Sequence, residues 1–484
     1  LARIDAGLAA AAGGVAFEDH GLREEWRDLV EHSTVLVGRI PAEFRALPSE
    51  VLETVLVHHQ KYISLRDADG AITRFAAVVN GDGASGAEIV RGMERVVVAR
   101  LRDAAFFLAE DGKRPLGARV QDLAGVTFHQ GLGTYRDKAL RLARLVEEMG
   151  RLGLLDAPAC TAAAQAARLA KADLVTLMVR EFPELQGVMG GLYLEAEGAP
   201  AEVATAVRWH YHPLAVEPDA DPAAAFSGRD QQARVFAAVS LADKLDTLAG
   251  YFGIGENPTG SRDPFGLRRA GQGAVRVALD FWRPRAGEKS PDLLALLDAA
   301  IAGYGSLKLP ADKAAAVAAM FLVDRLGYVL EARGLAADEV SAVVAAPERD
   351  ALRDPVDALR RVEALHRVRQ EVPQDFAALA EAFKRAKNIL TQAEPAARVD
   401  PVLFESEAER QLLDAASRLQ AMAAGTYDEQ LRGLAGLRAP VGRFFDDVLV
   451  MAEEPQRGNR LALLKMTLSL FYRIADISRL GGMS

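Results

Sequence analysis

The chain has 484 residues, of which 50% are hydrophobic and 26% charged, with a formal net charge of −9 at pH 7. This balance is typical of a globular protein and excludes both a disordered chain and one that coats nucleic acid over its whole surface. Cys160 is the only cysteine, which excludes an internal disulfide and a cysteine-based zinc site. No apolar run approaches the roughly 20 residues of a membrane span. We therefore expect a cytoplasmic protein without membrane association, and, because it begins at Leu1, a fragment or processed chain.

A mixed pattern of strand and helix fills the first part of the chain. Residues 33–40 and 74–82 have the composition and alternation of β-strands, and residues 48–60 between them are predicted to form a capped helix. The DADG turn at 67–70 joins KYISL at 61–65 to the later strand. These features predict a small sheet with a hairpin.

From about residue 86 the pattern is helical and remains so. Long amphipathic helices are predicted over 86–112 and 133–153. Proline and glycine interrupt the later helices at 156–159, 183–191, 213–222 and 253–266. The last segment, 376–480, is predicted to be entirely helical.

The histidines give no metal-binding pattern. His58 and His59 are adjacent, so their side chains point apart. His210 and His212, in WHYHP, have no carboxylate at a helical spacing of three or four. We interpret this second pair as packing residues.

Residues 120–250 combine several helices with scattered acids, a layout similar to that of HD phosphohydrolases. Those enzymes need a His-Asp dipeptide, an earlier histidine and a later aspartate, because imidazoles and carboxylates together hold the metal that activates water. The chain contains no His-Asp dipeptide, and only Asp243 or Asp246 remains at the later position. We expect both carboxylates to be structural, paired with Lys244, Arg262 or a helix N-terminus. Neither a metal site nor a catalytic residue is expected.

The stretch 250–273, GYFGIGENPTGSRDPFGLRRAGQG, has the composition of a phosphate-binding loop. Its glycine spacing fits neither the Walker motif nor the dinucleotide-binding motif, and the residues before it have helical periodicity. We interpret it as a helix ended by Gly250, a tight turn, and a new helix entered through Asp263 and Pro264.

Several long runs follow one another in the order of one known family. They are HHQKYISL, VRGMERVVVARLRDAAFF, KADLVTLMVREFPELQGVMG, LADKLDTLAGYFGIGENPTGSRDPFGLRRA, AFKRAKNIL, VDPVLFESEAER and PVGRFFDDVLVMAEEPQRGNRLALLKM. Together they resemble the β subunit of the bacterial heterotetrameric glycyl-tRNA synthetase over nearly the whole chain. The family's IGTEELP-like N-terminal segment is missing, which suggests N-terminal truncation, and Gly442 stands where an aspartate is common.

The resemblance implies a mostly helical, multidomain protein with four segments. Residues 1–115 would be an α/β portion similar to the editing-associated domain of phenylalanyl-tRNA synthetase β chains, and residues 116–285 a degenerate HD-like helical domain. Residues 286–375 would be a helical connector, and residues 376–484 an anticodon-binding helical domain.

The resemblance also implies a function. The chain would be the noncatalytic, tRNA-recognising subunit of glycine–tRNA ligase. It would bind glycine tRNA and the α subunit in an α2β2 assembly, while ATP and Mg²⁺ bind the α subunit and no cofactor binds this chain. Two alternatives stay open: an HD-type metal-dependent phosphohydrolase and a noncatalytic helical scaffold.

Basic clusters supply the candidate RNA contacts. Residues 262–289 hold seven Lys or Arg against three acids, and phosphate contacts from such residues provide most non-specific nucleic-acid affinity. In the last segment, two basic strips are predicted to border a groove around the FFDDVLVM helix. The candidate tRNA-binding residues are Arg262, Arg268, Arg269, Lys384, Arg385, Lys387, Asn388, Arg443, Arg457, Arg460 and Lys465.

Overall fold

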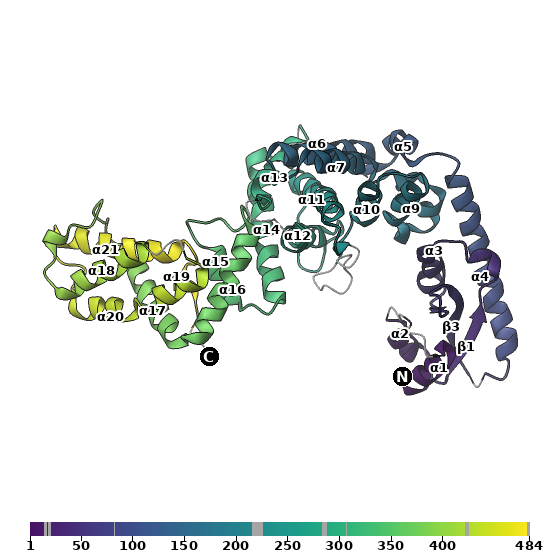
Figure 1. Ribbon diagram of the computed structural model, residues 1–484, viewed down its shortest axis with the longest axis horizontal. Coiled ribbons are helices and arrows are strands. Elements are labelled where there is room, and N and C mark those ends of the chain that lie inside the picture. The colour runs from purple at the N-terminus through teal and green to yellow at the C-terminus, as the bar shows by residue number, and fades with distance from the viewer. Residues whose placement is uncertain are drawn as a thin grey trace. The chain divides into compact units, whose positions relative to one another are not determined.

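The computed structural model describes residues 1–13, 17, 21–81, 83–214, 226–282, 288–305, 307–421 and 425–481. The chain forms two compact units, of which the first combines Leu1–Leu140 with Gln165–His210 and the second combines Arg141–Ala164 with Tyr211–Ser484. Both units are mostly helical, as the sequence predicts (Figure 1). Across the described ranges, no helix is both long and apolar enough to cross a membrane.

A three-stranded antiparallel sheet lies in the first unit. Its strands are β1 (Ser33–Arg39), β2 (Ile63–Arg66) and β3 (Ile72–Asn80), in the order β1-β3-β2. The predicted strands and the hairpin between β2 and β3 are thus confirmed. Gly70 has a φ of +83°, a conformation that glycine adopts without steric cost, and this places the turn where the sequence predicted it.

Helices cover both faces of this sheet. On one face, α1 (Ala2–Ala12) and α2 (Leu22–Leu29) bury Leu8 and Trp26 against Ile63 of β2. On the other, α4 (Gly86–Asp111) packs against β1. The helix predicted between the strands is α3 (Ser49–Glu53) continued by a π-helical turn, η2 (Thr54–His59). The residue before α3 is Pro48, so the predicted side-chain cap is not formed.

The remainder of the first unit packs on the C-terminal end of α4. The buried carboxylate of Asp111 accepts the backbone N–H groups of Leu177 and Met178 and the hydroxyl of Tyr193. A hairpin that the sequence did not predict, β4 (Thr127–His129) with β5 (Gly133–Thr134), precedes α6 (Tyr135–Arg151). The other elements are α5 (Leu116–Arg119), η3 (Val120–Gly125), η4 (Ala172–Val175), α8 (Leu177–Glu181), η5 (Pro183–Leu185), α9 (Val188–Ala196) and α10 (Ala201–Trp209).

The second unit is built around one buried helix, α11 (Asp230–Gly253), in which every residue from Val235 to Gly253 except Thr247 is buried. Its surroundings explain this burial, because α12, α13 and α14 pack directly against it. The elements of this part are α12 (Leu267–Arg276), η8 (Val277–Phe281), α13 (Leu293–Ala302) and α14 (Ala311–Ala332). Two further helices, α6 (Tyr135–Arg151) and α7 (Ala157–Leu169), belong partly to each unit.

The C-terminal part of the second unit is helical, as predicted. It contains α15 (Ala337–Val344), α16 (Pro355–Glu371), α17 (Pro373–Leu390), η9 (Pro401–Leu403), α18 (Glu407–Ala421), α19 (Tyr427–Ala435), α20 (Arg438–Asp447), α21 (Gln456–Tyr472) and η10 (Ile477–Arg479). Four of these helices, α17, α18, α20 and α21, form a bundle, which we call the C-terminal bundle (Figure 1). In it α17 and α18 each contact both α20 and α21, so α20 and α21 lie diagonally opposite.

The last residues of the chain return to the helices before the bundle. The N–H of Asp476 donates to the carbonyl of Ala342 at 2.8 Å, and the fully buried guanidinium of Arg361 donates to the carbonyl of Ile474 at 3.0 Å. The C-terminal tail therefore completes the packing of α15 and α16.

Candidate nucleic-acid interface

The Gly-rich stretch is a structural turn between α11 and α12. The carboxylate of Asp263 accepts the N–H groups of Leu267 and Arg268, at 2.8 and 2.9 Å. A phosphate at the N-terminus of a helix would need those same N–H groups. The acidic side chain takes the place of an anion, which agrees with the interpretation of a turn followed by a helix entered through Asp263.

The end of α11 differs from the prediction. The helix continues to Gly253, three residues beyond the predicted end at Gly250. The cause is tertiary packing: the side chain of Leu307 fills the space where a Cβ of Gly253 would lie, and Gly253 accepts the N–H of Leu309. The chain turns only at Gly255, whose φ is +85°.

Of the three arginines predicted around this turn, two are exposed. Arg262 and Arg269 face solvent, and Arg262 lines a shallow cleft of about 280 Å³. Arg268 is partly buried and donates to the carbonyl of Gly260 at 2.6 Å, so it also stabilises the turn. Arg262 and Arg269 are therefore the better placed of the three to meet a phosphate.

Asp246 is held by a partner that the sequence did not suggest. Arg141, 105 residues earlier in the chain, donates to the Asp246 carboxylate at 2.7 Å, and both side chains are buried. The Tyr304 hydroxyl donates to the same carboxylate at 3.0 Å. Burial lowers the pKa of Arg141, but the charge and hydrogen bonds of Asp246 outweigh it and the pKa is raised. Asp246 is therefore structural, with Arg141 and Tyr304 as partners that the sequence did not suggest.

This pair bears on the hydrolase alternative. A guanidinium occupies the position at Asp246 that a metal cation would need. Within the described ranges, no three His, Cys, Asp or Glu side chains gather in a way that could hold a metal ion. His210, fully buried, contacts the Lys171 ammonium at 2.9 Å and the Val207 carbonyl at 2.6 Å, as its interpretation as a packing residue implies.

One exposed stacked pair lies in the C-terminal bundle. The guanidinium of Arg385, on α17, lies 4.7 Å from the centroid of the Phe445 ring on α20. Arg385 is exposed and Phe445 half-buried, whereas the neighbouring Phe444 fills the core. Arg443, also exposed, donates to the side-chain oxygen of Gln411 at 2.8 Å. We call Arg385, Arg443 and Phe445 the α20 surface.

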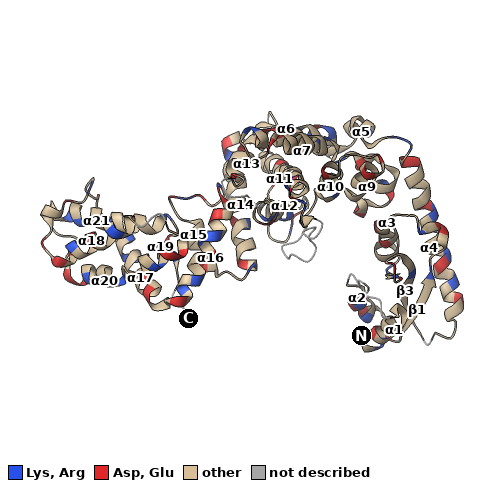
Figure 2. Cartoon of the chain, viewed as in Figure 1, with Lys and Arg blue, Asp and Glu red and all other residues tan. Residues whose placement is uncertain are grey.

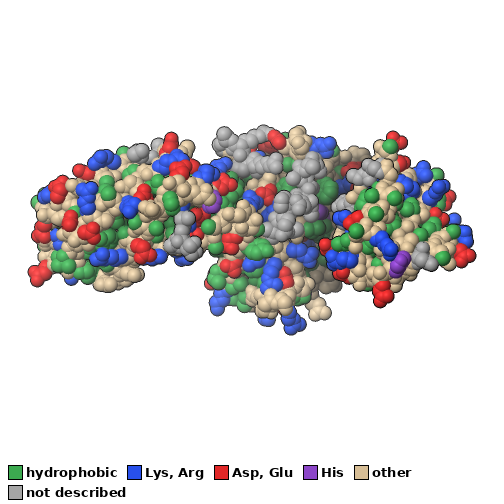
Figure 3. Space-filling model, turned by 90° about the horizontal axis from the view of Figure 1, so that it is seen from below, with side chains coloured by type: hydrophobic (Ala, Val, Ile, Leu, Met, Phe, Trp, Pro, Cys, Tyr) green, Lys and Arg blue, Asp and Glu red, His purple; other side chains and the backbone are tan. Residues whose placement is uncertain are grey.

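The other predicted contacts on α17 are partly engaged with acids. Lys384 lies 3.5 Å from Glu381, and Lys387 donates to the buried carboxylate of Asp476 at 2.7 Å. Asn388 is exposed near the end of the helix. These residues border the α20 surface without forming a patch of one charge. Acidic and basic residues are interspersed along the C-terminal helices (Figure 2), and their side chains are mixed on the face shown in Figure 3.

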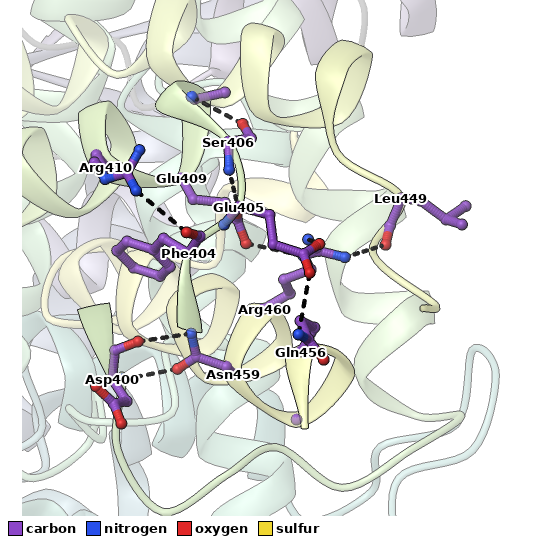
Figure 4. Close-up of polar contacts among 12 residues, drawn as sticks. Asp400, Phe404, Glu405, Ser406, Glu409, Arg410, Leu449, Gln456, Asn459 and Arg460 are labelled. Carbon is purple, nitrogen blue, oxygen red and sulfur yellow. Dashed lines mark hydrogen bonds and ion pairs between the residues drawn. The ribbon is translucent and has the colours of Figure 1, made fainter. Parts of the chain in front are cut away.

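Arg460 is buried at one end of the bundle, where it joins two loops (Figure 4). Its guanidinium donates to Glu409 and Glu405, both at 2.8 Å, and to the carbonyl of Leu449 at 3.1 Å. Glu409, itself fully buried, also accepts the N–H groups of Glu405 and Ser406. Burial lowers the pKa of Arg460, but the two carboxylates of Glu409 and Glu405 have the larger effect, so the pKa is raised overall. We therefore assign Arg460 a structural role in place of the RNA contact suggested by the sequence.

The predicted groove is corrected by the packing of the bundle. The helix of FFDDVLVM ends at Asp447, and α20 lies diagonally opposite α21 rather than beside it. Arg457 pairs with Glu454 at 2.9 Å, and Lys465 is exposed on α21 with no partner among the described residues. The strips on α17 and α21 therefore do not border α20 together.

Sequence reasoning missed the exposed apolar side chains near the loops that Arg460 joins. Val402, Leu449 and Met451 are 88%, 74% and 40% exposed. Leu449 and Met451 follow directly after the end of α20, inside a run that the sequence predicted as helix. Residues 448–451 are all apolar, so the sequence gives no signal that exposed and buried side chains alternate there.

Comparison with known proteins identifies the family. The model of a family described as "Glycyl-tRNA synthetase beta subunit" matches residues 2–345. The chain is 40% identical over 488 residues to the "Glycine--tRNA ligase beta subunit" of Moorella thermoacetica, covering 98% of this chain and 67% of that protein. It is 42% identical over 471 residues to the protein of that name in Aromatoleum aromaticum, covering 95% and 64%. The chain thus spans about two thirds of the length of these relatives. It belongs to the glycyl-tRNA synthetase β subunit family.

Proposed function

We propose that this chain recognises glycine tRNA for a glycine–tRNA ligase, in which a separate α subunit attaches the amino acid. The family assignment supports this proposal. The family model is described as a glycyl-tRNA synthetase β subunit, and both relatives carry the name of a glycine–tRNA ligase β subunit. The name implies an α subunit as partner, and we propose an α2β2 assembly in the cytoplasm. The HD-type hydrolase is not favoured, because Arg141 neutralises Asp246.

The domain assignments are part of this proposal. We propose that residues 1–115 correspond to an editing-associated portion, 116–285 to a degenerate HD-like domain and 286–375 to a connector. The C-terminal segment, 376–484, would bind the anticodon. The C-terminal bundle accounts for most of this last segment.

The observation that carries the anticodon proposal is the exposed stack of Arg385 on Phe445. Proteins that read RNA sequence splay out single-stranded bases, stack them on aromatic or guanidinium planes and hydrogen-bond their edges. The α20 surface offers both kinds of plane side by side, with the donors of Arg443 nearby. Arg443 keeps only a neutral partner, Gln411, which a base edge could replace at small cost.

We further propose that this chain is noncatalytic, and that ATP and Mg²⁺ bind the α subunit. Asp263 occupies the N–H groups at the N-terminus of α12, so they are not available to a nucleotide phosphate. Asp246 is paired with Arg141, so its carboxylate is not available to the metal that accompanies a nucleotide. We expect no ATP–pyrophosphate exchange with glycine from this chain alone, and exchange once the α subunit is added. Exchange by the purified chain alone would contradict this part of the proposal.

Substitution within the α20 surface tests the anticodon proposal. Arg443→Ala is expected to weaken binding of glycine tRNA by roughly 1–3 kcal/mol, the usual cost of losing one base contact. Arg385→Ala should have an effect of the same size, because it removes one plane of the stack. Binding is measured by titrating labelled tRNA with the full chain.

Arg398→Ala is the matched control, since Arg398 is exposed and has no partner in the described part of the chain. Equal losses in the control and in both variants would show that only overall charge matters. Point variants are preferable to deleting residues 376–484, because the deletion would also remove the Ile474 carbonyl that accepts from buried Arg361.

A further inference from the structure

A second basic site lies in the first unit, far in sequence from the C-terminal bundle. A cleft of about 770 Å³ opens between α4 and the ends of β1 and β3. It is lined by six arginines, which are Arg39, Arg45, Arg74, Arg91, Arg95 and Arg102. Among the described lining residues Glu94 is the only acid and none is a lysine, so these residues carry a formal excess of five positive charges in a chain whose net charge is −9.

Most of these guanidinium groups have no internal partner. Four of them, on Arg39, Arg45, Arg95 and Arg102, are exposed and make no hydrogen bond or ion pair with any described residue. Arg91 lies 3.8 Å from Glu88, too far for a hydrogen bond. The Glu94 carboxylate is already occupied, since it accepts the backbone N–H of Arg39 at 2.9 Å.

The arrangement costs stability unless an anion is bound. Arg91, Arg95 and Arg102 are four and seven residues apart, so they lie along one face of α4, where like charges at this spacing repel. Arg39 and Arg74 are directly opposite each other in the register of β1 and β3, a position in which like charges also destabilise. Arg74 reduces part of this repulsion, because its guanidinium donates to the carbonyl of Ala11 at 2.8 Å.

We propose that this cleft, which we call the α4 cleft, binds the phosphodiester backbone of RNA. Arginine presents a planar fork of donors that matches a phosphate, and every basic residue in the described lining of the cleft is an arginine. From Arg91 to Arg102 the row is about 16 Å long, from the helical rise of 1.5 Å per residue. A nucleic-acid strand carries a phosphate every few ångströms along its axis, so the row spans several phosphates.

The lining also predicts that the cleft binds RNA without reading its sequence. None of the described residues that line the cleft is aromatic, so they offer no ring on which a base could stack. Contacts to phosphate position an RNA without reading its sequence. An acidic protein surface is the competing occupant, but protein interfaces have an apolar core. Here six arginines outnumber the four apolar lining residues, of which Ile40 is buried, Ala42 is exposed, and Pro41 and Val98 are half-buried. The inference rests on the proposed function only in identifying the RNA as tRNA.

The test compares two RNAs and three forms of the full chain. The RNAs are glycine tRNA and an unrelated RNA hairpin without the glycine anticodon. The proteins are the wild type, the double variant Arg95→Gln with Arg102→Gln, and a control with Arg180→Gln and Arg360→Gln. Both control arginines are exposed helix residues without partners in the part of the chain that the structure describes. Affinity for each RNA is measured across a range of salt concentrations, and thermal melting confirms folding.

The α4 cleft variant should bind both RNAs about tenfold or more weakly at low salt. The slope of log affinity against log salt should shrink by roughly two, one for each lost phosphate contact. The control should match the wild type. Unchanged affinity and slope for both RNAs would overturn the inference, as would a wild type that binds neither RNA.

A third measurement asks whether each form of the chain retains the α subunit. If the α4 cleft variant keeps its RNA affinity but no longer retains the α subunit, the occupant is a protein and the inference is wrong. A wild type that binds both RNAs equally would contradict the proposed function alone. The loss caused by the double variant would then still support the α4 cleft.

Discussion

Replacing Arg460 with alanine is expected to destabilise the C-terminal bundle by about 3–5 kcal/mol, the cost of leaving a buried charge without its partner. Glu409 is fully buried, and after Arg460 is removed its carboxylate would lose its buried cationic partner and keep only the backbone N–H groups of Glu405 and Ser406. The carbonyl of Leu449 would also lose its donor. The measurement is hydrogen exchange of the backbone amides of α18 and α21 in the full chain, which reports the stability of this bundle separately from the rest.

Arg457→Ala is the matched control for this prediction. It lies on the same helix but forms an exposed pair with Glu454, so its removal should cost less than about 1 kcal/mol. Similar protection in Arg460→Ala and Arg457→Ala would show that the network in Figure 4 does not hold the bundle together.

Replacing Asp246 with alanine is the second change with a large expected effect. It leaves the Arg141 guanidinium buried without its counter-ion and removes one of the two acceptors of the Tyr304 hydroxyl, which keeps the backbone carbonyl of residue 246. We expect a loss of about 3–5 kcal/mol, measured by chemical denaturation of the full chain. Asp298→Ala, an exposed change in the same unit, should stay within about 0.5 kcal/mol.

This prediction also separates the structural account of Asp246 from the hydrolase alternative. Removal of a structural carboxylate lowers stability, whereas removal of a metal ligand would lower the metal content and the phosphatase activity. A stoichiometric divalent metal lost on Asp246→Ala, together with unchanged stability, would contradict the assignment of Asp246 to an ion pair with Arg141.

Much of the fold could be predicted because its signals are local. Alternation over a few residues located β1 and β3, and the DADG turn placed the hairpin between β2 and β3. The end of α11 could not be located in this way. It depends on Leu307, which packs on Gly253 from more than 50 residues away.

The candidate interface was harder to predict, because an arginine on a helix can be buried or exposed. Arg385 and Arg460 were proposed for the same task, yet one lies on an aromatic ring at the surface and the other is buried. Helical spacing does not separate buried from exposed arginines here. Arg460 precedes the core residue Leu464 by four positions and Arg457 precedes the core residue Leu461 by four, yet only Arg460 is buried.

The α4 cleft could be predicted only in part. The spacing of Arg91, Arg95 and Arg102 is visible in the sequence of α4. Their meeting with Arg39 and Arg74 is not, because it depends on how β1 pairs with β3 and on where α4 packs. Long-range pairing of this kind leaves no local pattern.

The central claim is that the C-terminal bundle reads the glycine anticodon through the α20 surface. The most direct test measures kcat/KM for charging of glycine tRNA and of the same tRNA with a substituted anticodon, by this chain assembled with its α subunit. We predict that the wild type charges the substituted tRNA less efficiently, and that Arg385→Ala combined with Phe445→Ala removes most of this difference. Equal charging of the two tRNAs by the wild-type assembly would contradict the claim.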